Sequence, residues 1–132
     1  MKRFTLALAL GLSVMALAVS CASTQDKKDT VRLVTYNVGV FGKWDLSSED
    51  YTATLMKELD PDAIALQELD SCTTRSGVER FQAETFAAAM GENWGHSYGY
   101  ALKSYKEGSY GIGEVWNKDR MKMKNVFKVM LP

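Results

Sequence analysis

Asn37 and Glu68 are the two polar side chains whose positions best fit a chemical site. Each ends an apolar stretch that is typical of a strand, residues 31–37 for Asn37 and residues 62–68 for Glu68. A carboxylate and an amide oxygen at the same end of neighbouring strands would suit Mg²⁺, which takes oxygen ligands and keeps water and substrate phosphate in its shell. Taken singly, Asn37 could be a turn residue and Glu68 a surface carboxylate.

A strand–helix–strand unit would position these two residues. The first strand, within residues 31–41, is almost continuously apolar, which favours burial on both faces. After a loop at residues 39–44, Ser47 with Asp50 three residues later predicts a helix start. Pro61 ends this helix, and the second strand covers residues 63–66. The expected apolar face of the helix consists of Tyr51, Leu55, Met56 and Leu59.

The rest of the chain predicts one more helix and three more strands, without an internal repeat. Gly91 is the expected stop of the helix, whose apolar side would consist of Phe81, Thr85, Ala88 and Ala89. The expected elements in order are a polar loop at 70–77, the helix at 78–90, a strand at 94–102, a charged turn at 103–109, a strand at 110–116, a basic turn at 117–124 and a strand at 126–131.

The first 20 residues have the pattern of a secretory signal rather than of the fold. Lys2 and Arg3 precede an uncharged apolar run that ends in small residues before Cys21. This pattern resembles a bacterial lipoprotein processing box, which predicts that Cys21 is lipidated and anchors the chain to a membrane of the cell envelope, facing the periplasm or the surface. Ordinary cleavage nearby and an uncleaved anchor are the alternatives. Residues 21–30 are polar and predict a flexible tether, and residues 31–132 would form the domain.

Composition limits the number of domains, the class of binding partner and the possible disulfides. A chain of 132 residues leaves room for one domain. Without the signal segment the acidic residues slightly outnumber the basic ones, which argues against a broad nucleic-acid footprint. If Cys21 carries lipid, Cys72 is left without a disulfide partner. Cys72 has no activating histidine nearby in the sequence, because His96 lies in a different segment.

Two sequence motifs resemble a known family. TYN at residues 35–37, followed by ALQELDSCTTRSG at residues 65–77, is similar to the opening motifs of the endonuclease/exonuclease/phosphatase superfamily. Residues 101–113, with Gly108 and the run Tyr110-Gly111-Ile112-Gly113, resemble the segment that precedes the next core strand of that family. The superfamily includes relatives of type I deoxyribonuclease, abasic-site endonucleases, inositol-polyphosphate 5-phosphatases and bacterial sphingomyelinases. The motifs are specific for the superfamily and not for a substrate.

The resemblance implies an α/β fold, namely the N-terminal half of a two-sheet β-sandwich flanked by helices. It also implies hydrolysis of phosphodiester or phosphomonoester bonds with Mg²⁺ or Mn²⁺, with Glu68 as metal ligand and Asn37 supporting metal and phosphate. Arg75 could hold a phosphate through its planar guanidinium or simply face solvent. Tyr110 could reach the phosphate or pack within its strand. The substrate could be a nucleic acid, an inositol phosphate or a phospholipid head group, and no protein partner is predicted.

The sequence also departs from the family. The later aspartate-x-asparagine motif and the C-terminal aspartate-histidine pair do not occur in it. The sequence therefore predicts the front part of such an enzyme, without its C-terminal catalytic residues. The alternatives are a non-catalytic remnant or binding module, and an unrelated α/β surface lipoprotein whose strand ends imitate the motifs. A half-sandwich would expose a strand edge and an apolar sheet face.

Overall fold

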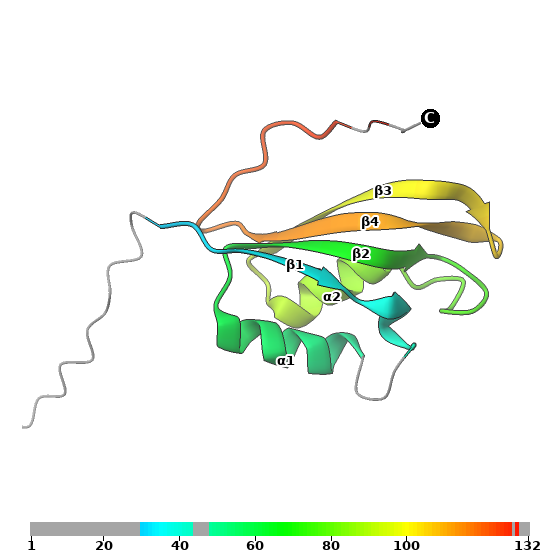
Figure 1. Cartoon of the computed structure of the whole chain (residues 1–132), viewed down its shortest axis with the longest axis horizontal. Coiled ribbons are helices and arrows are strands. Elements are labelled where there is room, and N and C mark those ends of the chain that lie inside the picture. The colour runs from blue at the N-terminus through cyan, green and yellow to red at the C-terminus, as the bar shows by residue number, and fades with distance from the viewer. Residues whose placement is uncertain (1–29, 44–47, 128, 130–132) are drawn as a thin grey trace, which may run out of the picture.

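The computed structural model describes residues 30–43, 48–127 and 129. These residues form a mixed α/β unit, in which α1 and α2 lie on one face of a single sheet (Figure 1). The predicted fold class is therefore confirmed. In chain order the elements are β1 (Leu33–Asn37), the short 3₁₀ turn η2 (Gly39–Phe41), α1 (Glu49–Leu59), β2 (Ala63–Ser71), α2 (Gln82–Met90), β3 (Trp94–Tyr105) and β4 (Gly108–Asn117).

The sheet has the strand order β1-β2-β4-β3. β1 runs parallel to β2, so the β1–α1–β2 segment is the predicted crossover unit. β4 is antiparallel to both β2 and β3. The parallel pairing ends where Asn37 lies opposite Gln67, and β2 continues beyond β1 to Ser71 alongside β4.

The core lies between the sheet and the two helices. Ile64, Leu66 and Val115 are fully buried on the helix side of the sheet. Phe86 of α2 is also fully buried and stacks on Phe41 of η2 with ring centroids 5.2 Å apart. Burying a large apolar side chain of this kind contributes about 1.5–3 kcal/mol, so this contact holds the turn after β1 firmly against α2.

The expected burial of the first strand on both faces is wrong. β1 is the edge strand of the sheet formed by the described residues, and Leu33 on its open face is 68% exposed. Only its helix side is covered, where Val34 packs against the core. The expected strand at 126–131 is not formed by Val126, Phe127 or Val129, and its other residues lie outside the described ranges.

Both predicted helix faces are wrong by a rotation of about one residue, except that Met56 of the expected α1 face is buried as predicted. α1 buries Thr52, Ala53 and Met56, whereas Tyr51, Leu55 and Leu59 of the expected face are exposed. The reason is Glu49, which is buried and forms an ion pair with Arg80 near the start of α2. α2 likewise buries Gln82, Ala83, Phe86, Ala87 and Met90.

Helix and turn boundaries also differ from the expectations. Ser48 caps α1 by accepting a hydrogen bond from the Tyr51 N–H, whereas the expected cap Ser47 lies outside the described residues. α2 starts at Gln82 rather than at residue 78, because turns at residues 73–80 precede it. β3 runs on to Tyr105, and the hairpin turn is only Lys106 and Glu107, both with positive φ. This tight turn places the hairpin tip against the end of β2.

The predicted signal, the lipidation site and all of the predicted tether except Thr30 lie outside the described residues. No helix of the part that the structure describes is long and apolar enough to cross a membrane.

Candidate active site

Asn37 and Glu68 meet where the parallel pairing of β1 with β2 ends, although β2 itself runs on to Ser71 rather than ending at residue 66 as predicted. The Asn37 Nδ2 donates a hydrogen bond to the Glu68 Oε1 at 2.8 Å. The Asn37 Oδ1 accepts one from the Gly39 backbone N–H at 3.0 Å. The amide is thus fixed on both sides, and it orients the carboxylate.

A bulge in β2 aims Glu68 at Asn37. The register of β2 against β4 shifts between Leu66 and Leu69, and Glu68 has a φ of 58°. Positive φ is uncommon for a residue with a side chain, and it persists only where the surroundings impose it. Here the Val38 N–H donates to the Gln67 carbonyl at 3.1 Å, which holds the bulge against the chain after β1. Bulges often re-aim side chains next to active sites.

The charges around Glu68 favour its ionised form. The hydrogen bond from Asn37 lowers the pKa of Glu68, and the charges of Lys43 and Arg75 lower it further. The Lys43 Nζ lies 3.6 Å from the Glu68 Oε2, and the Glu68 side chain is 29% exposed. The carboxylate is therefore charged, oriented and accessible from solvent.

The donor set fits a sparsely coordinated hard cation. Among the described residues, no three His, Cys, Asp or Glu side chains come together to hold a metal ion. Mg²⁺, however, is often bound through only one or two carboxylates, with water and substrate phosphate completing its shell. Glu68 could supply that carboxylate. The Asn37 amide oxygen is used by Gly39, so Asn37 acts through Glu68 in this arrangement.

Asp70, only two residues further on, is the centre of a buried polar cluster. Its carboxylate accepts hydrogen bonds from Thr73 Oγ1 at 2.7 Å and from Ser76 Oγ at 2.5 Å. Arg75 donates to it twice, from Nε at 2.7 Å and from Nη2 at 2.8 Å. Burial raises the pKa of Asp70, but these donors outweigh burial and leave the pKa lowered. The loop at residues 72–77 thus folds around a fully buried carboxylate.

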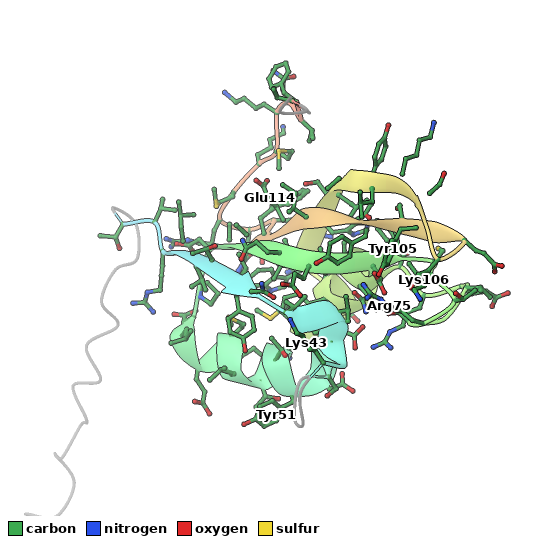
Figure 2. All side chains as sticks on the ribbon, turned by 45° about the vertical axis from the view of Figure 1, so that its right-hand side comes forward. Lys43, Tyr51, Arg75, Tyr105, Lys106 and Glu114 are labelled. Carbon is green, nitrogen blue, oxygen red and sulfur yellow. The ribbon has the colours of Figure 1, made fainter. Side chains whose placement is uncertain are left out.

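Arg75 stands between this cluster and two tyrosines. Its guanidinium carbon lies 5.0 Å from the ring centroid of Tyr105 and 5.4 Å from that of Tyr110. Tyr110 is the cross-strand partner of Asp70. Burial raises the pKa of Tyr110, and the charge of Glu68 raises it further. Figure 2 shows Arg75, Tyr105 and Lys106 near one another at the hairpin tip, and Lys43 beside the turn after β1.

The structure therefore gathers the four predicted site residues of the domain, Asn37, Glu68, Arg75 and Tyr110, at one end of the sheet. His96 instead packs its ring edge-to-face with Phe81, at a centroid distance of 5.5 Å. Cys72 is a free thiol.

Sequence reasoning missed residues whose neighbours come from distant segments. Lys43 and Tyr105 stood in stretches read only as loop and turn. Gln82 is fully buried: its Oε1 accepts from the Asp70 N–H at 2.7 Å and its Nε2 donates to the Val40 carbonyl at 2.6 Å. It thereby ties the turn after Asn37 to the strand segment after Glu68. No short motif marks such a bridging glutamine.

The structure is similar to a solved structure described as an endonuclease/exonuclease/phosphatase family protein from Leptotrichia buccalis C-1013-b, with a TM-score of 0.57 and 16% sequence identity. The match covers 73% of this chain and 40% of that chain. No family model and no curated protein matches the chain. At this identity the likeness shows the fold alone, which is part of an endonuclease/exonuclease/phosphatase-like fold. The chain spans less than half the length of that structure.

Proposed function

We propose that this chain contributes one wall of the active site of a divalent-metal-dependent phosphoesterase. The observation that carries the proposal is the 2.8 Å hydrogen bond from Asn37 that holds the Glu68 carboxylate where the parallel pairing of β1 with β2 ends. The likeness of the fold to an endonuclease/exonuclease/phosphatase family protein supports the same reaction class. The hydrolytic activity is itself proposed, because the chain spans only part of that structure.

In this proposal Glu68 holds Mg²⁺ or Mn²⁺, and Asn37 keeps the carboxylate in position. A metal ion bound there would neutralise charge that develops on a phosphate oxygen as water attacks. Lys43, beside Glu68, adds a positive charge that favours an anionic substrate. Arg75 and Tyr110 remain predicted substrate contacts. Asp70 takes no part in binding metal, because Arg75, Thr73 and Ser76 already use its oxygens.

The test is hydrolysis of bis-p-nitrophenyl phosphate and of plasmid DNA by the purified chain with Mg²⁺ or Mn²⁺. Because the chain supplies only one wall of the site, we expect slow turnover that depends on the metal and that Glu68→Gln abolishes. Titration calorimetry with Mn²⁺ gives a second readout, in which the wild type binds and Glu68→Gln does not. Turnover that survives Glu68→Gln unchanged would show that the site is assigned wrongly.

The alternative is a remnant or binding module without hydrolase activity. It is favoured by the single solvent-accessible carboxylate at the site, since no cluster of three metal-ligating side chains occurs among the described residues. Mn²⁺ binding that needs Glu68, without any turnover, would identify this case. The same substrates and the same variant therefore separate the two functions.

We also propose that Cys21 is lipidated and anchors the domain to a membrane of the cell envelope. The support is the sequence pattern around Cys21 alone. Growth with a radiolabelled fatty acid should label the wild type and not Cys21→Ser. Absence of label from the wild type would contradict the anchor and leave the proposed active site untouched.

A further inference from the structure

Gln82, the first residue of α2, is a fully buried amide whose two polar ends reach two different backbone segments of the candidate site. Its Nε2 donates to the Val40 carbonyl at 2.6 Å, in the turn that follows Asn37. Its Oε1 accepts from the Asp70 N–H at 2.7 Å, two residues beyond Glu68. The side chain therefore connects the segments that carry the two site residues.

These contacts close a hydrogen-bond ring that passes through the Asn37–Glu68 pair. From Val40 the backbone leads to the Gly39 N–H, which donates to the Asn37 Oδ1 at 3.0 Å. The Asn37 Nδ2 donates in turn to the Glu68 Oε1 at 2.8 Å. From Glu68 the backbone leads on to the N–H that is bound by Gln82. Gln82 thus closes the ring from the buried side, whereas the carboxylate of Glu68 stays accessible.

The turn on one side of this ring has an unusual backbone conformation. Gly39, Val40 and Phe41 have positive φ values of 53°, 54° and 48°. Glycine adopts this region readily, but a β-branched residue such as valine is a marked outlier there. Such a conformation persists only where the surrounding structure imposes it. The bond from Gln82 to the Val40 carbonyl is one restraint of this kind.

α2 provides a second restraint on the same turn. Phe86 lies four residues after Gln82, which places both side chains on one face of the helix. The Phe86 ring stacks on Phe41 with ring centroids 5.2 Å apart. The rotation of α2 is fixed near its start by the ion pair between Arg80 and Glu49. The helix is therefore a firm base from which Gln82 holds the turn.

We propose that Gln82 is a positioning residue, which holds Asn37 and Glu68 in the arrangement that binds the metal ion. This inference rests on the metal site proposed above. Without Gln82 the backbone at Val40 relaxes, and the Gly39 N–H turns away. The Asn37 amide then loses one of its two restraints and no longer fixes the carboxylate. Gln82 acts on metal affinity in this way without touching the ion.

Gln82→Met tests the ring, because methionine fills the buried space without offering a donor or acceptor of comparable strength. We expect the Mn²⁺ affinity, measured by titration calorimetry, to fall by about tenfold, as for other groups that orient a metal ligand. Gln82→Asn is one methylene too short to reach both backbones and should give the same loss. It replaces Gln82→Met if urea denaturation shows that the methionine variant does not fold.

Met90→Val is the matched control for a general loss of packing. Met90 is buried at the other end of α2 and is not part of the hydrogen-bond ring. The substitution should lower the urea midpoint but leave the Mn²⁺ affinity as in the wild type. An equal loss of affinity in Met90→Val and Gln82→Met would overturn the positioning role.

Hydrogen exchange of the metal-free protein gives a readout that needs no metal. The bond to Asn37 protects the Gly39 N–H, so its exchange rate reports on the ring directly. In Gln82→Met we expect this N–H to exchange about fivefold faster relative to the N–H of the buried Ile64, the value of one hydrogen bond. In Met90→Val the ratio of the two rates should stay as in the wild type.

Val40→Gly tests whether Gln82 acts through the strained turn. Glycine adopts positive φ readily, so a turn with glycine at this position depends less on Gln82. In the Gln82→Met background, the second substitution should raise the Mn²⁺ affinity by about threefold, because the turn regains its shape without the restraint. A double variant that binds Mn²⁺ no better than Gln82→Met would overturn the action through the turn.

The outcomes separate this inference from the proposed function. A wild type that does not bind Mn²⁺ would overturn the metal site, and the exchange rate of the Gly39 N–H would still decide the role of Gln82. Unchanged Gly39 exchange in Gln82→Met would overturn the positioning role even if the wild type binds Mn²⁺. Unchanged Mn²⁺ affinity in Gln82→Met would overturn it as well.

Discussion

Glu68 and Asp70 are two carboxylates on one strand with opposite surroundings. Glu68 sits at the bulge with one side-chain hydrogen bond from Asn37 and an ion pair with Lys43, and about a third of its side chain remains exposed. Asp70 is fully buried and accepts four hydrogen bonds from three side chains. Asn37 orients Glu68 without using up its oxygens, whereas Arg75, Thr73 and Ser76 leave Asp70 no capacity for a ligand.

The difference teaches how a site can be built beside a rigid support. Asp70 organises the loop that carries Arg75, and the bulge keeps Glu68 turned away from that cluster. A buried charge is tolerated only when it is paired and fully hydrogen-bonded. An oriented but accessible carboxylate can exchange its partners for a cation. The contrast can be tested one contact at a time.

The largest effect is expected from Asp70→Asn. This change should lower the free energy of unfolding by about 2–3 kcal/mol, because the buried acceptor of four hydrogen bonds loses its charge while Arg75 stays partly exposed. Glu68→Gln is the matched control and should change it by less than about 0.5 kcal/mol, as for other surface sites. Urea denaturation of both variants measures the difference. Equal losses would show that the two carboxylates have the same structural role.

Acid should weaken the protein through the same cluster, by a smaller amount, because a protonated Asp70 can still form hydrogen bonds. The folded state lowers the pKa of Asp70, so its contribution to stability is complete above the unfolded pKa of about 3.9. It is lost as the pH falls through the lower folded pKa. Urea midpoints should therefore drop below about pH 4, and less steeply in Asp70→Asn. The lowered pKa of Glu68 acts in the same direction, and Glu68→Gln measures its share.

Asn37→Ala should weaken Mn²⁺ binding by about 10- to 100-fold, the usual effect of losing a group that orients a metal ligand. Thr35→Ala is the control, because Thr35 accepts a hydrogen bond from Gln67 on the same two strands without touching Glu68. It should leave Mn²⁺ affinity unchanged. Titration calorimetry measures the Mn²⁺ affinity of both variants. Equal losses of affinity would show that Asn37 has no specific role in orienting Glu68.

The smallest effects separate single contacts within the two regions. Ser76→Ala removes one bond to the buried Asp70 and should cost about 1.5 kcal/mol in unfolding free energy. Lys43→Gln breaks the more exposed pair with Glu68 and should cost less than about 0.5 kcal/mol. Thermal melts of the two variants resolve the difference. A larger loss of stability in Lys43→Gln than in Ser76→Ala would contradict the view that the contacts of Glu68 contribute less to stability than those of Asp70.

Much of the frame could be predicted from the sequence. The apolar runs before Asn37 and Glu68, with a helical segment between them, predict a parallel crossover that brings both residues to one edge, and the structure has this arrangement. The two hairpin strands were predicted too short, because the first was ended at residue 102 and the second was started at residue 110. Tyrosines at the tip belong to the strands, because the turn needs only Lys106 and Glu107.

The faces of the helices could not be predicted from periodicity alone. Tyr51, Leu55 and Leu59 recur at helical spacing, yet α1 turns them outward because the ion pair of Glu49 with Arg80 fixes its rotation. A pairing between segments 31 residues apart leaves no local trace. The prediction that the first strand is buried on both faces is wrong for a similar reason. The place of β1 at the sheet edge depends on which strands pair with it.

The sequence by itself determined the fold class and the pair Asn37 and Glu68, because the succession of strands and helices along the chain and the apolar pattern within each are local properties. Only the tertiary structure decided which carboxylate is free. The bulge at Glu68, the donors around Asp70 and the two tyrosines beside Arg75 come from four separate segments. Their roles follow from burial and hydrogen bonding, which exist only once those segments are packed together.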